Sequence, residues 1–171
     1  HVDAVLLSPP LSDHAQLVSF LQAQPVALGL LSPVSHHTTI VAADINNVKA
    51  GAAVAEDLLE AGHTRFGLIG GPDGHGSAVG RCDGFHGYLI EAGFSEDDII
   101  RIDGDFSFKS GLDAAATIFD APKRPTAIFA ANDDMAAGAM NAALKLGLSV
   151  PEDVSIVGFD GSQLADQIWP R

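Results

Sequence analysis

The sequence predicts an α/β fold, in which parallel strands form sheets with flanking helices. Short apolar runs alternate along the chain with longer segments whose apolar residues recur at the spacing of a helix. Parallel strands need such crossover segments between them. A chain of 171 residues with 47% apolar content can bury a substantial core. We therefore expect one large globular unit or two small ones.

The first third of the chain begins with a strand of four apolar residues. A segment of helical period follows it, and then a second and a third apolar run. Gly62 comes directly after the next helical segment and marks its end, because a left-handed backbone costs least at glycine. In chain order, the predicted elements are a strand at 4–7, a helix at 12–24, strands at 25–28 and 39–41, and a helix at 46–61.

The remaining two thirds repeat the order of strand and helix. Gly93 and Gly147 end two of these helices, as Gly62 does before them. The segment 70–76 is the only concentration of glycine and proline, and it joins a strand to a helix. The predicted elements are strands at 66–69, 99–102, 127–130 and 154–159, helices at 77–92, 107–119 and 133–146, and a short last helix.

Composition and charge exclude several classes of protein. Nine Lys and Arg against 22 Asp and Glu give a net charge of -13, which works against contact between these residues and a phosphate backbone. Cys82 is the only cysteine, so no internal disulfide is possible. The longest apolar runs, such as 126–131, are far shorter than the roughly 20 residues that span a bilayer. Residues 1–3 do not begin a signal peptide, and we expect a soluble, cytoplasmic protein.

Polar and aromatic residues follow the predicted strands where the strands end. In open α/β sheets, ligands bind beyond the carboxyl ends of the strands. Arginine, carboxylate, amide and aromatic groups around one cleft suit a small neutral polar ligand, and a sugar fits best. The candidate residues are Ser8, Asp44, Asn46, Asn47, His75, Ser77, Arg81, Phe106, Asn132, Asp133, Asp134 and Asp160.

Several of these residues also suit a purely structural role. Ser77 and Asp133 are well placed to cap helices, and Asn132 can satisfy the backbone of a loop. Phe106 can equally be a core residue. Arg81 lies near a helix N-terminus, where the helix dipole disfavours a cation, and this favours a specific role.

No motif indicates an enzyme, a cofactor or a metal. The glycine-rich segment 70–77 lacks the Lys-Ser/Thr of a phosphate loop and the spacing of a dinucleotide fingerprint. Cys82 has the pattern of a packed residue rather than a nucleophile. His14, His36 and His37 match no metal-ligand spacing. We therefore predict a binding protein that uses neither cofactor nor metal.

Four motifs in order resemble the lactose/galactose-repressor (LacI/GalR) family of bacterial transcription regulators. The last of them, Pro-Glu-Asp-Val-Ser-Ile-Val-Gly-Phe-Asp, is specific, because periplasmic sugar-binding proteins of similar fold usually lack it. The motifs are Gly62 to Pro72, Arg81-x-x-Gly84-Phe85, Pro125 to Ala136 and Val150 to Asp160. The similarity covers nearly the whole chain.

The resemblance implies two Rossmann-like subdomains of the periplasmic-binding-protein type I kind, with a ligand cleft between them. Residues 1–61 are then part of the N-terminal subdomain, and 62–171 are most of the C-terminal one. The DNA-binding helix-turn-helix is absent from these residues, and both ends look cut, so we expect a fragment of a longer chain. The family further implies a homodimer whose subdomains rotate when an effector binds and so control operator DNA binding. Helices 77–92 and 133–146, with Phe85, Tyr88 and Met140, are candidates for the dimer face.

Position by position, the resemblance implies a set of effector contacts that largely coincides with the residues after the strands. Leu30 departs from the family, because many sugar-responsive members carry an acidic residue there. A second departure is the pair Asn46-Asn47, where Asp-Asn is common. Both departures predict a less polar wall on the first subdomain, with Asn46 retained as a candidate. The implied contacts are Ser8, His75, Ser77, Arg81, Phe106, Asn132, Asp134 and Asp160.

Two functions remain open at this point. The first is the effector-sensing domain of a repressor that binds a sugar-like metabolite. The alternative is a periplasmic sugar-binding protein of a transporter, which shares the fold. The identity of the effector, and its action as inducer or co-repressor, do not follow from the sequence.

Overall fold

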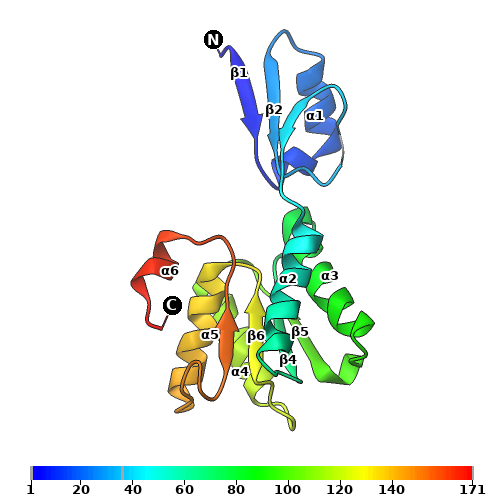
Figure 1. Cartoon of the computed structure of the whole chain (residues 1–171). Helices are drawn as coiled ribbons and strands as arrows, with labels where there is room; N and C mark the ends of the chain where they lie inside the picture. Colours follow the sequence, from blue (N-terminus) through cyan, green and yellow to red (C-terminus); the bar gives the residue numbers. More distant parts are fainter. Residues whose placement is uncertain (1, 36, 171) are drawn as a thin grey trace.

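A computed structural model describes residues 2–35 and 37–170, and it confirms the predicted fold class. The chain forms two bodies, joined by the segment that leads from the first sheet into α2 (Figure 1). The smaller body holds a three-stranded sheet of order β1-β2-β3, and the larger holds a four-stranded sheet of order β5-β4-β6-β7. Every pair of neighbouring strands is parallel.

The smaller body packs one helix on one face of its sheet. Leu7 and Leu30 point from neighbouring strands toward Val18 of the helix and form a small buried cluster with Ile40. The opposite face is uncovered, since Val41 is 82% exposed. The elements are β1 (Ala4–Leu7), a 3-10 turn (Leu11–Asp13), α1 (Ala15–Gln22), β2 (Ala27–Leu31) and β3 (Val41–Ala43).

The helix and the two later strands of this body differ from their predicted bounds at both ends. The helix begins at Ala15 rather than residue 12, because the His14 Nδ1 atom accepts a hydrogen bond from the Leu17 N–H and caps it there. The second and third strands begin two residues late. Pro25 has no N–H to give to a ladder, so pairing with the first strand starts at Ala27.

The prediction that Leu30 makes the wall of the ligand site less polar needs correction. The residue lies inside β2 and is 1% exposed, in the small core. Its departure from the family pattern therefore fills the core instead of changing the polarity of a wall.

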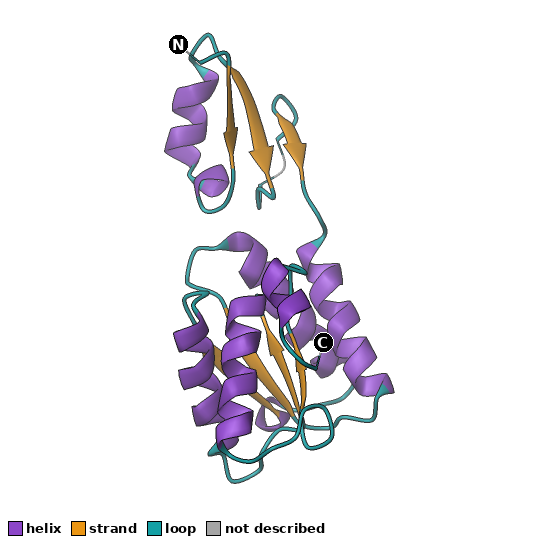
Figure 2. Cartoon of the chain, turned by 90° about the vertical axis from the view of Figure 1, so that its left-hand side faces the viewer, coloured by secondary structure: helices purple, strands orange, loops and turns teal. Residues whose placement is uncertain are grey.

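The larger body has helices on both faces of its sheet, with α2 beside α3 and α4 beside α5 (Figures 1 and 2). The central strands β4 and β6 are buried along their whole length. The elements are α2 (Asn47–Glu60), β4 (Phe66–Gly70), α3 (Gly76–Glu91), a 3-10 turn (Glu96–Asp98), β5 (Ile99–Asp103), α4 (Phe108–Phe119), β6 (Ala127–Ala130), α5 (Asp133–Lys145), β7 (Ser155–Val157) and α6 (Gln163–Gln167).

The last strand is shorter than predicted. It ends at Val157, and the backbone then bends at Phe159 and Asp160, where the φ of Asp160 is 106°. A Cβ atom at position 158 would lie 2.5 Å from Asp133 Oδ1 and 3.1 Å from the Ala136 Cβ, so this segment packs closely against α5.

Helix α2 packs with the larger body, although the predicted boundary at 61/62 assigns it to the first subdomain. Its Ala55 and Leu58 belong to the large core. A Cβ atom at Gly51 would overlap the backbone of Arg81, so α2 and α3 are in direct backbone contact there. The division between the two cores therefore falls before α2.

Phe85 does not contribute to an exposed face. Its ring is fully buried, with the Phe66 and Phe129 ring centroids 6.1 Å and 5.1 Å away. Tyr88 and Met140, the other two candidates for the dimer face, are partly buried. In the described residues, no helix is both long and apolar enough to cross a membrane.

Candidate functional site

A cavity of about 220 Å³ lies where the two bodies meet. One side comes from the residues after the first two strands and the segment that enters α2. The other comes from the N-terminal part of α3 with its N-cap, and from the bend after β7. The lining residues are Pro9, Ser32, Ile45, Asn47, His75, Ser77, Arg81, Phe159 and Asp160. Of the predicted site residues, Asn47, His75, Ser77, Arg81 and Asp160 therefore lie together.

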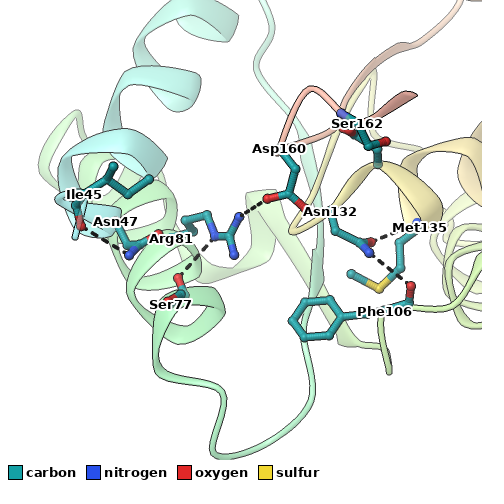
Figure 3. A network of polar contacts seen from close by, with 10 residues as sticks. Ile45, Asn47, Ser77, Arg81, Phe106, Asn132, Met135, Asp160 and Ser162 are labelled. Carbon is teal, nitrogen blue, oxygen red and sulfur yellow. Dashed lines mark hydrogen bonds and ion pairs between the residues drawn. The ribbon is translucent and has the colours of Figure 1, made fainter. Parts of the chain in front are cut away.

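Arg81 is the buried charge of this site. Its Nη1 atom lies 3.2 Å from Asp160 Oδ1, and its Nε donates to the Ser77 carbonyl at 3.2 Å (Figure 3). The Arg81 side chain is 6% exposed and that of Asp160 is 54% exposed. The Cζ atom of Arg81 lies 4.1 Å from the centroid of the Phe159 ring. The guanidinium is therefore held by a carbonyl, a carboxylate and an aromatic face.

Two buried polar atoms beside Arg81 have no partner in the described part of the chain: His75 Nδ1 and Ser77 Oγ. The expectation that Ser77 caps its helix is wrong, because α3 begins one residue earlier and His75 holds the N-cap position without a side-chain bond. Burial and then the nearby charge of Arg81 lower the pKa of His75 below its ordinary value of 6.5, which favours the neutral ring. A neutral imidazole and a hydroxyl can each give or take a hydrogen bond.

Phe106 and Asn132 form the support behind His75. The His75 and Phe106 rings are T-shaped with centroids 4.8 Å apart. Asn132 Nδ2 donates to the Phe106 carbonyl at 3.0 Å, and Asn132 Oδ1 accepts from Met135 N–H at 3.0 Å, which caps α5 (Figure 3). Both ends of the Asn132 amide are therefore engaged within the protein.

Asp133 does not cap α5, contrary to the prediction. Asn132 does so, and the Asp133 carboxylate instead accepts from Ser162 N–H at 2.6 Å. This bond joins α5 to the segment after Asp160.

Ser8, Asn46 and Asp134 lie outside the lining of this cavity. Ser8 is exposed, and its carbonyl accepts from Ser12 N–H. The Asn46 side chain accepts from Lys49 N–H at 2.9 Å and caps α2, and Asn46 lines an adjoining cavity of about 420 Å³. Asp134 is exposed in the first turn of α5, where the helix dipole favours a carboxylate.

The sequence reasoning did not single out Phe159, Pro9, Ser32 or Ile45. Pro9 and Ser32 follow β1 and β2 almost directly, so a search of every position after a strand end would have found them. The same search would have found Phe159, since it directly precedes Asp160 after the last strand.

Residues with strained backbone conformations lie at or beside the same cavity. In the described residues, the non-glycine residues with positive φ are Ser32 at 43°, Phe106 at 68° and Asp160 at 106°. Ser32 and Asp160 line the cavity, and Phe106 contacts His75, which also lines it. Such conformations cost about 1–3 kcal/mol each and concentrate at functional sites.

The described residues contain no group of three or more His, Cys, Asp or Glu placed to hold a metal ion. His36, one of the histidines considered for a metal, lies outside the described residues.

Comparisons with known proteins agree with the fold. A family model described as a periplasmic binding protein-like domain matches residues 55–170. The ribose operon repressor of Escherichia coli (strain K12) is 34% identical over 125 residues, which are 73% of this chain and 38% of that protein. The transcriptional regulator DegA of Bacillus subtilis (strain 168) is 31% identical over 171 residues, or 99% of this chain and 50% of that protein. This chain thus spans half or less of the length of these relatives.

Solved structures show the same similarity. A complex of the transcriptional regulator CelR with cellobiose superposes with a TM-score of 0.84 at 32% identity, covering 97% of this chain and 51% of that one. A regulatory protein of the LacI family from Chloroflexus aggregans gives a TM-score of 0.86 at 27% identity, covering 99% of this chain and 60% of that one.

Proposed function

Because the chain belongs to the periplasmic-binding-protein-like family, in the branch of the lactose/galactose-repressor regulators, we propose that it senses a small polar effector for a DNA-binding repressor. The observation that carries the proposal is the pairing of the buried Arg81 with the half-exposed Asp160 at a cavity between two bodies. A ligand that touches both sides of this cavity binds one arrangement of the bodies better than another, and only such differential binding can shift the arrangement.

The site favours a neutral polyhydroxyl compound such as a sugar. Arg81 and Asp160 cancel each other's charge, so an anion gains little from the pair. A ligand hydroxyl can accept from the guanidinium while it donates to the carboxylate. The free atoms of His75 and Ser77 offer further partners for hydroxyl groups.

The chain's relatives support regulation over transport. They are described as repressors and regulators, and the solved CelR complex holds a sugar, cellobiose. By the same reasoning we propose a homodimer in the cytoplasm that binds operator DNA through a helix-turn-helix outside this chain. The net charge of -13 fits an arrangement in which these residues do not touch DNA.

The first experiment measures binding of neutral sugars to the purified chain, with ribose and cellobiose included, by thermal shift and then by calorimetry. Arg81→Ala and Asp160→Ala each remove a charged hydrogen-bonding partner, so we expect affinity to fall roughly 10- to 100-fold. Glu91→Ala is the control, because this carboxylate is exposed at the end of α3 and outside the cavity lining. Undiminished binding in both cavity variants would refute the proposed site.

A further inference from the structure

The aromatic ring of Phe159 lies against the guanidinium of Arg81, on which the proposed effector site depends. Its centroid is 4.1 Å from Arg81 Cζ, within the range of a cation–π contact. Phe159 also lines the cavity. We infer that Phe159 is a positioning residue that fixes the orientation of Arg81 for the effector. Its consequence for binding rests on the proposed function, whereas its effect on Arg81 does not.

The ion pair alone is a weak restraint on Arg81. Asp160 is 54% exposed, and pairs with a solvated partner contribute little to stability. The Arg81 side chain is 6% exposed, however, so most of its lost hydration has to be replaced by protein contacts. A cation–π contact strengthens as it is desolvated, which makes the ring an effective partner here.

Some N–H groups of the Arg81 guanidinium bind other parts of the protein, and the rest are available to a ligand. The Ser77 carbonyl takes Nε, Asp160 takes one hydrogen of Nη1, and the Phe159 ring lies against the Cζ atom. A guanidinium carries five N–H groups, so others remain for a ligand in the cavity that Arg81 lines. With the ring in place, these donors keep a fixed direction before the effector arrives.

One turn of the chain supplies both the ring and the carboxylate. Phe159 and Asp160 are adjacent, and they follow Gly158, where the chain passes against Asp133 and Ala136. The positive φ of Asp160 marks this turn as strained. The same turn therefore supplies two contacts to Arg81, which lies much earlier in the sequence.

The test replaces the aromatic ring of Phe159 with an apolar side chain that has no ring. Phe159→Leu is compared with Phe159→Tyr, which keeps the ring, and with Phe108→Leu, which alters a phenylalanine that is 45% exposed at the start of α4. The first readout is the NMR signal of the Arg81 Nε–H group, assigned by its loss in Arg81→Lys. In the parent we expect a ring-current shift from Phe159 that disappears in Phe159→Leu and persists in Phe159→Tyr and Phe108→Leu.

The second readout is affinity for whichever neutral sugar binds the parent. We expect it to fall roughly 5- to 30-fold in Phe159→Leu, to be restored in Phe159→Tyr and to be unchanged in Phe108→Leu. An Arg81 signal that is the same in the parent and in Phe159→Leu would overturn the inference, as would equal affinity in those two proteins. If no sugar binds but the ring-current shift is present and lost as expected, the contact of Phe159 with Arg81 stands and the proposed function fails.

Discussion

At the scale of single residues, hydrogen-bond partners separate structural groups from groups that are free for a ligand. Asn132 and Asn46 each lie between a strand and the following helix, where ligand-binding residues are common. Their side-chain oxygens, however, accept hydrogen bonds from backbone N–H groups and cap the helices. His75 and Ser77 have buried atoms without a partner in the described chain. Buried polar atoms are nearly always satisfied, which is why we propose that a ligand supplies the missing bond to these two atoms.

Asn132 is expected to stabilise the fold by capping α5. Asn132→Ala should lower the free energy of unfolding by about 1 kcal/mol, because Met135 N–H loses its acceptor. Asn132→Ser should recover most of this loss, since serine also caps helices, without restoring the bond to the Phe106 carbonyl. Urea unfolding followed by circular dichroism measures both changes. Equal losses in the two variants would show that the bond to Phe106, and not the cap, carries the stability.

His75 should make folding depend on pH near neutrality. Its pKa is lowered from the ordinary value of 6.5, first by burial and then by Arg81, which outweigh the opposing charges of Asp13 and Asp160. The unfolded chain therefore takes up the proton first as pH falls below 6.5, and stability is lost between that value and the lower pKa of the folded state. Above pH 6.5 the contribution is fully present. The parent should lose more stability than His75→Gln between pH 7 and pH 5 in urea unfolding, and parallel curves would contradict the assignment.

At the scale of elements, glycines set the distance between α2 and α3. A Cβ atom at Gly84 of α3 would overlap the carbonyl of Val48 in α2, and one at Gly51 of α2 would overlap the backbone of Arg81. These are collisions with backbone, which a rotamer change cannot relieve. The close contact places the beginning of α2, which lines the cavity through Asn47, directly beside the helix that carries Arg81.

Substitution of alanine at two glycines of α3 should change the stability of the protein in opposite directions. Gly84→Ala has to push α2 away, so we expect a loss of roughly 1–3 kcal/mol or more in stability. At Gly87 no atom lies within 4 Å of a new Cβ, and alanine there should add about 0.5–1 kcal/mol through its better helix propensity. Thermal unfolding of the two variants and of the unsubstituted protein measures both changes in stability. A stable Gly84→Ala protein would mean that the helices are further apart than described.

At the scale of the whole molecule, the two bodies have very unequal cores. The larger core joins residues from both faces of a four-stranded sheet, whereas the smaller cluster rests on Leu7, Val18, Leu30 and Ile40. Parallel sheets are usually covered on both faces, but the first sheet carries one helix. Local stability should therefore differ between the bodies.

Hydrogen exchange should reveal this difference. Strands β2 and β4 are matched, because each lies between two neighbouring strands in its sheet. The amides of β2 (Ala27–Leu31) should exchange much faster than those of β4 (Phe66–Gly70), since opening the smaller body exposes less apolar surface. Mass spectrometry of labelled peptides measures both segments in one sample. Equal protection would show that the two bodies open as a single cooperative unit.

The sequence by itself determined the order and type of the elements and the family. The strand at 127–130 was predicted at its observed bounds, and Gly62, Gly93 and Gly147 all have the positive φ expected after a helix. Apolar periodicity and glycine stops are local, so no knowledge of distant contacts was needed. Arg81 and Asp160 were also identified in advance. Asp160 follows the last strand, Arg81 lies near the start of the helix after another strand, and parallel strands gather their ends at one edge of the sheet.

Only the tertiary structure decided which residues meet and which remain free. The helical period of 46–61 does not say which core the helix joins, and close contact of Gly51 with Arg81 assigns α2 to the larger body. In the same way, the sequence placed Leu30 at a ligand wall, Phe85 on an outer face and Ser77 at a cap, and packing put each elsewhere. The contact of Phe159 with Arg81 joins residues 78 positions apart (159 − 81). Such contacts depend on how separate elements approach one another in space, and local sequence patterns carry no information about that approach.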